Sequence, residues 1–129
     1  MIISTPHCAA FVTSRTGFEF KSPHVAIGFS RGDIIYSAIV FQHWSGADIE
    51  LTVAGDDLPR SLLREAGRYA FDVLKCARVT FRTPPDNTAA IIAMGRLGGR
   101  LEGTQRRFYG DRDALVFGIL KEDYIYGRK

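Results

Sequence analysis

Apolar and polar positions in the first half of the chain form runs that are typical of β-strands. A short helix precedes these runs, because Thr5 and Pro6 supply a polar cap and a first helical residue, and Gly17 ends the apolar face. Turn signals at 31–33 and 45–48 separate the β-rich runs. The expected strands are residues 24–30, 33–44 and 49–55, which we predict to pair in order as antiparallel neighbours.

The middle of the chain changes to a helical pattern. Apolar residues recur at helical spacing from Leu62 to Leu74, after Asp56 or Asp57 as a cap and Pro59 in the first turn. A compact strand at 77–83 follows and is closed by two prolines. A strand, a helix and a strand in succession predict a right-handed crossover, so the strands at 49–55 and 77–83 should be parallel neighbours.

The last third of the chain is expected to hold a second helix and a hairpin. Asn87, with Asp86, caps this helix, and Gly98-Gly99 ends it in a left-handed conformation. The helix has apolar positions at Ala90, Ile91, Ala93, Met94 and Leu97. Two further strands, 100–109 and 114–123, are joined by a turn at 110–113. Together these elements predict an α/β fold with a mixed sheet and one domain spanning 1–129.

Composition and charge exclude few classes of function. The chain of 129 residues has a formal net charge of +3, and several arginines crowd its last third, namely Arg96, Arg100, Arg106, Arg107 and Arg112. Such a cluster suits a phosphate-rich ligand or a nucleic acid, but a charge this small is more typical of a solvated basic face. Nucleic acid is therefore the less favoured partner.

The two cysteines, Cys8 and Cys76, lack the spacing of a disulfide framework or a zinc site. His7, His24 and His43 likewise lack metal-ligand spacing, so no metal is expected. The chain shows neither a secretory signal pattern nor an apolar run that could span a membrane. We expect a cytoplasmic protein without a membrane association.

The helix start after the strand at 49–55 is the first candidate for a ligand site. Helix N-termini that follow parallel strands present free N–H groups and a partial positive charge. The backbone of residues 55–61 and the guanidinium of Arg60 could hold a pyrophosphate, although Asp56 and Asp57 add negative charge and Pro59 removes one donor. A plain capped helix start with exposed arginines fits the local sequence equally well.

A longer stretch, "DNTAAIIAMGRLGGRLEGTQRRFYGDRDALVFGILKED" at 86–123, resembles the closing segment of the GNAT superfamily of acetyl-CoA-dependent N-acetyltransferases. The likeness is greatest to the branch related to ribosomal-protein N-terminal acetyltransferases. The matching positions are Asn87, Ala90, Arg96-Leu97-Gly98, Glu102-Gly103, Arg106-Arg107 and Phe117-Gly118-Ile119-Leu120. The upstream half is similar to compact members found in phages and prophages, with the usual pair of N-terminal helices reduced to one.

This resemblance implies an activity and a set of site residues. It implies direct transfer of an acetyl group from acetyl-CoA to an amine. The backbone of Leu51 and Val53 would engage the pantetheine arm, Arg60 and Ser61 would lie at the pyrophosphate, and Asn87 would border the pantetheine. The resemblance does not identify the acceptor. A protein N-terminus, a lysine, a polyamine and a small antibiotic amine are all compatible with it.

Two positions depart from the family pattern. Asp57 and Pro59 stand where the pyrophosphate loop commonly has glycines, and in compact members arginine side chains near Arg60 can replace those backbone donors. Met94 stands where many relatives carry a tyrosine that protonates the departing thiolate, and a methionine can only pack in the core. Tyr109 could reach the site through the last hairpin, as could Tyr124.

Glu50 is the candidate base for the acceptor amine. If Ile49, Leu51 and Val53 point to one face of their strand, Glu50 and Thr52 point to the other. The alternative is an exposed strand carboxylate paired with an arginine.

A second hypothesis is a non-catalytic module of the same fold that binds a protein or nucleic acid through its arginine-rich hairpin. A shortened N-terminal region can also leave a sheet edge uncovered, which would allow a homodimer.

Overall fold

A mixed sheet of seven strands forms the frame of the computed structural model, which describes residues 1–55 and 58–127. Within these residues the strand order is β1-β2-β3-β4-β5-β7-β6. Every neighbouring pair is antiparallel except β4 and β5, which are parallel. The strands are β1 (Ile2–Ile3), β2 (His24–Arg31), β3 (Ile34–Gln42), β4 (Asp48–Gly55), β5 (Arg78–Thr83), β6 (Arg100–Gln105) and β7 (Ala114–Leu120).

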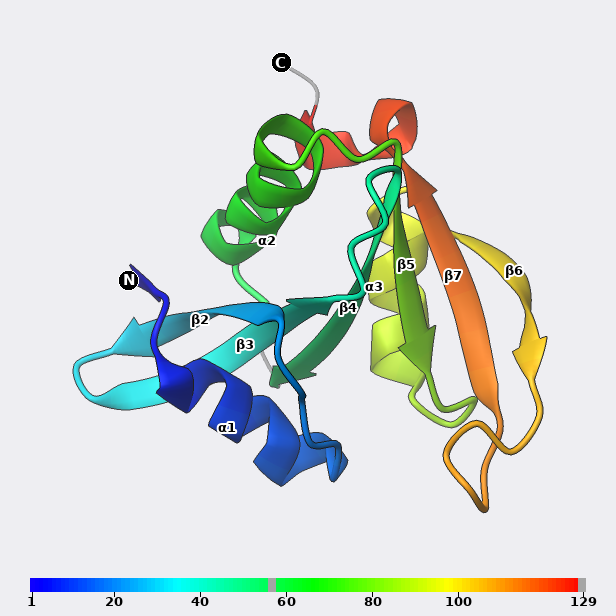
Figure 1. Cartoon of the computed structure of the whole chain (residues 1–129), viewed down its shortest axis with the longest axis horizontal. Helices are drawn as coiled ribbons and strands as arrows, with labels where there is room; N and C mark the ends of the chain where they lie inside the picture. The colour runs from blue at the N-terminus through cyan, green and yellow to red at the C-terminus, as the bar shows by residue number, and fades with distance from the viewer. Residues whose placement is uncertain (56–57, 128–129) are drawn as a thin grey trace.

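Helices cover both faces of this sheet (Figure 1). The helix α1 (Pro6–Thr16) packs on one face against β2, β3 and β4. The helices α2 (Arg60–Gly67) and α3 (Thr88–Arg96) pack on the opposite face, and α2 continues as the π-helical segment η1 (Arg68–Val73). Two short 3-10 segments, η2 (Lys121–Asp123) and η3 (Ile125–Gly127), follow β7.

The predicted architecture is confirmed in its main features. The three antiparallel strands, the parallel crossover neighbours and the last hairpin are all present. The helix after Thr5 runs to Thr16, and one helix lies between β1 and β2, as expected from the reduced N-terminal region. Gly17 closes it with a φ of +80°, and Gly98 follows α3 with a φ of +102°. Both glycines therefore end helices in the left-handed region.

Several expectations about the elements need correction. The strands expected at 100–109 and 114–123 end at Gln105 and Leu120, because the chain turns at Arg107, whose φ is +55°, and enters η2 after Leu120. The two-residue strand β1 was not predicted, because Ile2 and Ile3 are too short a run to show a period. The helix expected from Leu62 to Leu74 is regular only to Gly67 and then widens into η1. Pro59 is its N-cap residue, and the predicted caps at residues 56 and 57 lie outside the described residues.

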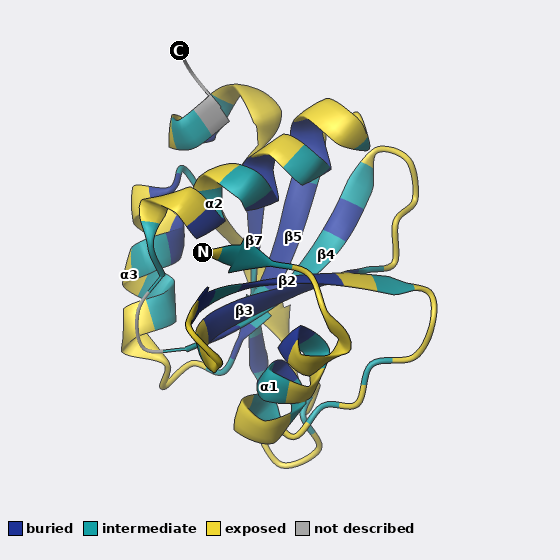
Figure 2. Cartoon of the chain, turned by 90° about the vertical axis from the view of Figure 1, so that its left-hand side faces the viewer, coloured by how far each residue is buried: buried dark blue, intermediate teal, exposed yellow. Residues whose placement is uncertain are grey.

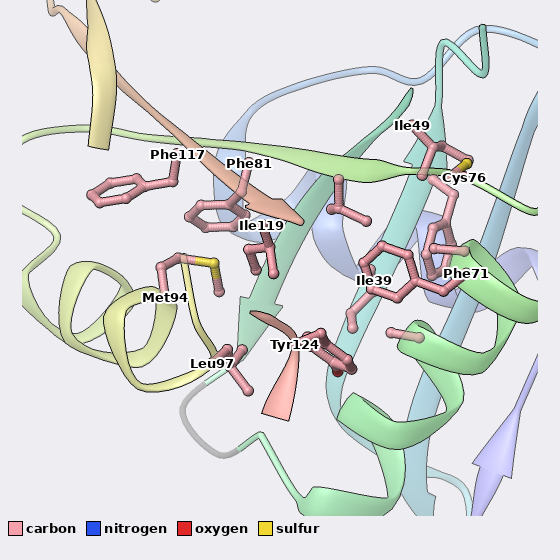
Figure 3. Packing of buried hydrophobic residues seen from close by; sticks show 14 of the residues in the cluster. Ile39, Ile49, Phe71, Cys76, Phe81, Met94, Leu97, Phe117, Ile119 and Tyr124 are labelled. Carbon is pink, nitrogen blue, oxygen red and sulfur yellow. The ribbon is translucent and has the colours of Figure 1, made fainter. Parts of the chain in front are cut away.

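The buried side chains form two clusters separated by the sheet. The larger cluster lies between the sheet and α2, η1 and α3, and the smaller one lies between the sheet and α1. Figure 2 shows the burial of α2 on its inner side and the exposure of its outer side. In Figure 3, Met94, Phe81 and Ile119 lie together where α3 meets β5 and β7. Met94, at 5% exposure, has the packing role that its chemistry predicted.

Charged side chains of β4, β5 and β6 form a network at the end of the sheet where β4 and β5 begin. The Arg78 guanidinium lies 3.3 Å from Asp48 Oδ1 and 2.6 Å from Glu102 Oε1. The Thr80 hydroxyl donates to the same Asp48 oxygen at 2.7 Å. The hydrogen-bonded guanidinium also holds the pKa of the Glu102 carboxyl below its usual range. This network ties the first residues of the parallel pair together.

The parallel pairing of β4 and β5 ends early. Its register runs from Asp48 opposite Arg78 to Leu51 opposite Phe81, whereas β4 stays paired with β3 as far as Gly55. Figure 1 shows the two strands side by side where they begin and apart where they end. Beyond Leu51, the edge of β4 that faces β5 is therefore not covered by a strand.

Gly55 closes β4 in a conformation that side chains disfavour. Its φ is +124°, and a Cβ there would lie 2.6 Å from Ser37 Cα on β3. Backbone strain and steric overlap thus both require glycine at the end of this strand.

We predict that Gly55→Ala lowers the free energy of unfolding by about 2 kcal/mol, because the added methyl meets the backbone of β3. Gly95→Ala in α3 is the matched control, since no heavy atom lies within 4 Å of a Cβ there. Alanine in an open helical position should raise the free energy of unfolding by up to about 1 kcal/mol. Urea denaturation of both variants measures the difference, and equal stabilities would contradict the assignment.

Candidate functional site

Three adjoining cavities lie where β4 and β5 separate. The Asn87 cavity has a volume of about 520 Å³ and is bordered by β4, β5 and α3. The Glu50 cavity, of about 300 Å³, lies toward the segment after α1 and the β6–β7 loop. A middle cavity of about 230 Å³ shares Val53 and Phe81 with the first and Thr52 and Arg82 with the second. The three together cross the sheet through the separated strands.

The N-terminus of α3 shapes the Asn87 cavity. The Asn87 side-chain oxygen accepts a hydrogen bond from the Ala90 N–H at 3.3 Å, so the predicted cap is confirmed. The same residue lines both the Asn87 cavity and the middle cavity. The helix presents Ala89, Ala90 and Ala93 to the first of these, and their small side chains leave room for a ligand.

The end of β4 forms the opposite wall. Val53 lines the Asn87 cavity and the middle cavity, and Leu51 lines the Glu50 cavity. Both side chains are also half-buried against the larger core cluster. Because β5 is paired with β4 only as far as Leu51, the backbone of the following residues can accept or donate hydrogen bonds to an extended ligand.

The N-terminus of α2 adds positive potential after β4. Arg60 and Ser61 are its first two residues, and both are exposed. The N–H groups of Leu62 and Leu63 bond to the Pro59 carbonyl at 3.0 Å and 3.2 Å, while the first turn contains no acidic residue. A helix start of this kind favours an anion. Neither Arg60 nor Ser61 is among the described residues that line the three cavities.

Glu50 and Thr52 point into the Glu50 cavity, while Ile49 is buried in the core on the other face of β4. The predicted alternation along this strand is therefore confirmed. Glu50 forms an ion pair with Arg82 of β5 and a hydrogen bond with Nδ1 of His43, which follows β3. From its sequence context His43 was expected to be a structural or solvated histidine, but the hairpin between β3 and β4 brings its end of β3 next to Glu50.

Arg82 is held in place by further contacts. Its Nε donates to Gln105 Oε1 at 2.7 Å, and its guanidinium carbon lies 5.0 Å from the centre of the Phe108 ring. The guanidinium is thus shared between the Glu50 carboxylate, β6 and an aromatic ring. No sequence pattern indicated this residue, because its partners lie more than twenty positions away on both sides.

Aromatic side chains enclose the Glu50 cavity on the side of the β6–β7 loop. The Tyr109 ring lies 5.2 Å from the rings of both Phe18 and Phe108. Tyr109 also lines the middle cavity, so its phenol stands between the two. Burial raises the pKa of this phenol, although the guanidinium groups of Arg82 and Arg112 oppose the shift. The phenol of Tyr109 is therefore neutral at physiological pH.

Tyr124 has a different place from Tyr109. It is buried in the larger core cluster, where its hydroxyl donates to the carbonyl of Leu63. Burial also raises the pKa of this phenol. The hydroxyl fastens the C-terminal segment to α2, and of the two tyrosines that the sequence suggested, Tyr109 is the one that reaches the cavities.

Other candidate chemistry is sparse in the described part of the chain. Residues 1–55 and 58–127 contain no group of three or more His, Cys, Asp or Glu residues that could hold a metal ion. None of the helices among the described residues has the length and apolar character needed to cross a membrane.

Comparison with known proteins gives structural relatives but no sequence family. No family model matches the chain, and no curated protein matches it. A presumed acetyltransferase from T. thermophilus has 24% identity and a TM-score of 0.70, covering 88% of this chain. The chain spans 66% of the length of that structure.

Two further solved structures match nearly the whole chain. The spermidine/spermine N-acetyltransferase SpeG from Vibrio cholerae has a TM-score of 0.76 and 12% identity, covering 100% of this chain and 96% of its own. The ribosomal-protein-S18-alanine N-acetyltransferase from Escherichia coli has a TM-score of 0.66 and 17% identity, with 93% and 92% covered. The fold of this chain is therefore that of the GNAT superfamily of acetyltransferases, as the resemblance at 86–123 predicted.

Proposed function

We propose that this protein is an N-acetyltransferase that passes an acetyl group directly from acetyl-CoA to a primary amine. The observation that carries the proposal is the early end of the β4–β5 pairing, which opens a strand edge and a cavity beside the capped start of α3. An extended chain with amide groups can add to such an edge as a further strand would. The pantetheine arm has this form.

On the donor side, the backbone of Leu51 and Val53 would bind the pantetheine, and Asn87 would border it from α3. Arg60 and Ser61 would hold the pyrophosphate at the start of α2, where the helix dipole favours an anion. Pro59 lacks an N–H group, so this turn offers fewer backbone donors than a glycine-rich loop. The Arg60 guanidinium would offset that loss through charge-assisted hydrogen bonds.

On the acceptor side, the Glu50 cavity would receive the amine. Glu19 and Glu50 place two carboxylates along its wall, beside the aromatic rings of Phe18, Phe108 and Tyr109. Carboxylates and aromatic faces both attract an ammonium group. Two of the three solved structures named above are acetyltransferases of a polyamine and of a protein alanine, and both acceptors are amines. Spermidine and an alanine-initiated peptide are therefore the first acceptors to try.

Tyr109 is the proton donor that we assign to the departing thiolate. It lines both the middle cavity and the Glu50 cavity, and its phenol is neutral. Met94, at the family position of the usual tyrosine, is buried and carries no proton to donate. We also propose a reducing, cytoplasmic setting, which the buried free thiols of Cys8 and Cys76 support.

Isothermal titration should show that the wild-type protein binds acetyl-CoA and that Arg60→Ala weakens the affinity about 10-fold, the effect of losing one charge-assisted hydrogen bond. Arg100→Ala on the exposed strand β6 is the matched control and should bind as the wild type does. Absence of binding by the wild type at millimolar acetyl-CoA would overturn the enzyme proposal. The arginine-rich hairpin would then be tested for a salt-sensitive interaction with nucleic acid.

Substitution of Asn87 can separate its two roles. Asn87→Ala should lower the free energy of unfolding by about 1 kcal/mol through loss of the cap, whereas Asn87→Ser keeps a capping oxygen and should be nearly as stable as the wild type. Both variants should bind acetyl-CoA more weakly, because neither has the amide group. If Asn87→Ser binds as tightly as the wild type in the same titration, Asn87 serves as a cap alone.

A further inference from the structure

His43 and Glu50 form a side-chain pair at the acceptor end of the site. His43 follows β3, and its backbone has a φ of +56°, in the left-handed region that few residues other than glycine occupy, with Asn, Asp and His the most frequent among them. Glu50 lies on β4 opposite Gln42. The turn of the backbone at His43 brings its imidazole against the Glu50 carboxylate, and both side chains line the Glu50 cavity.

The contact determines which nitrogen of the neutral imidazole carries the hydrogen. Nδ1 faces Glu50 Oε2, and an ionised carboxylate can only accept a hydrogen bond, so Nδ1 carries the hydrogen. When the ring is neutral, Nε2 therefore holds a lone pair. Within residues 1–55 and 58–127, Nε2 makes no hydrogen bond. A carboxylate that fixes a histidine in this way leaves the far nitrogen as the basic atom.

Glu50 itself is poorly suited to accept a proton. One of its oxygens is paired with the Arg82 guanidinium and the other with His43. Both carboxylate oxygens therefore already have partners, and neither is open to an incoming ammonium. Arg82 cannot move away freely, because Gln105 and the Phe108 ring hold it in place.

We infer that His43 Nε2 is the proton acceptor for the amine and that Glu50 is the residue that positions it. This inference rests on the proposed function. The acceptor enters as an ammonium and gives one proton to His43 Nε2. The free amine then forms a C–N bond to the acetyl carbon while the C–S bond breaks. The second amine proton goes to the departing sulfur, through Tyr109, and His43 returns the first to solvent.

The surroundings of His43 suit this role. Its side chain is 67% exposed, so a proton can leave to water, whereas that of Glu50 is only 18% exposed. His43 borders the Glu50 cavity and also a cavity of about 290 Å³ that is lined by residues of β2, β3 and η1. The other charged and titratable side chains that line these two cavities are Glu19, His24, Glu50, Tyr69, Arg82 and Tyr109. The carboxylate of Glu19 can draw the ammonium toward the histidine without competing for Nδ1.

Nitrogen-15 NMR of the histidine rings tests the geometry without any substrate. We expect neutral His43 in the wild type to carry its hydrogen on Nδ1, and Glu50→Gln to lose this preference. His43→Asn assigns the signal, and asparagine suits this site because it tolerates the left-handed backbone. A neutral His43 that carries its hydrogen on Nε2 in the wild type would overturn the inference.

Kinetics then tests the chemistry, with spermidine or the alanine-initiated peptide, whichever is acetylated faster. His43→Asn should lower kcat about 100-fold or more and leave acetyl-CoA binding unchanged, and Glu50→Gln should lower kcat by a smaller factor. His7→Asn, a change of the same kind at an exposed position on α1, should have wild-type kinetics.

Other outcomes separate this inference from the proposed function. Wild-type kcat in His43→Asn, with a large loss in Glu50→Gln, would make Glu50 the base and overturn the inference while the enzyme proposal stands. Failure of acetyl-CoA to bind in the titration would remove the proposed function instead. If neither acceptor is acetylated, the NMR result alone decides whether His43 is held for proton transfer.

Discussion

The early end of the pairing between β4 and β5 is the constraint on which the rest of the site depends. Four residue pairs, from Asp48 with Arg78 to Leu51 with Phe81, hold the strands together, and the Asp48–Arg78–Glu102 network fastens them at that end. Beyond Leu51, β4 follows β3 and β5 follows β7. A sheet that stayed paired throughout would have no opening, so the cavities are a consequence of strand divergence.

The two faces of the opening have different chemistry because different elements close them. On the α3 side, alanines and a capped helix start leave space with few charges. On the other side, Glu50, His43 and Arg82 meet aromatic rings from the loop between β6 and β7. This asymmetry matches a reaction in which an extended donor and a cationic acceptor approach one thioester from opposite sides of a sheet.

Local signals in the sequence were sufficient for most of the fold. The Thr5-Pro6 start of α1, the Asn87 cap of α3 and the crossover between β4 and β5 follow from residue types at neighbouring positions. The alternation that turns Glu50 away from the core follows from the period of a strand. No pattern of residue types indicated that the helix widens into the π-helical segment η1.

The acceptor side was less predictable, because it is built from contacts between distant residues. Arg82 reaches Glu50 and Gln105 from a separate strand, and Tyr109 meets Phe18 across the fold. The position of His43 beside Glu50 could have been predicted, because an antiparallel hairpin with a turn at 45–48 places residues near 43 beside those near 50. Its left-handed backbone, which turns the ring toward Glu50, has no signature in a single sequence.

Binding of the proposed donor at the uncovered edge of β4 can be measured at single amides. Hydrogen exchange followed by NMR, with and without saturating acetyl-CoA, reports on Val53 at this edge and on Ile39, its partner on β3. We expect acetyl-CoA to slow exchange at Val53 and to leave exchange at Ile39 nearly unchanged. Bound acetyl-CoA with unaltered exchange at Val53, or protection confined to the β6–β7 hairpin, would contradict it.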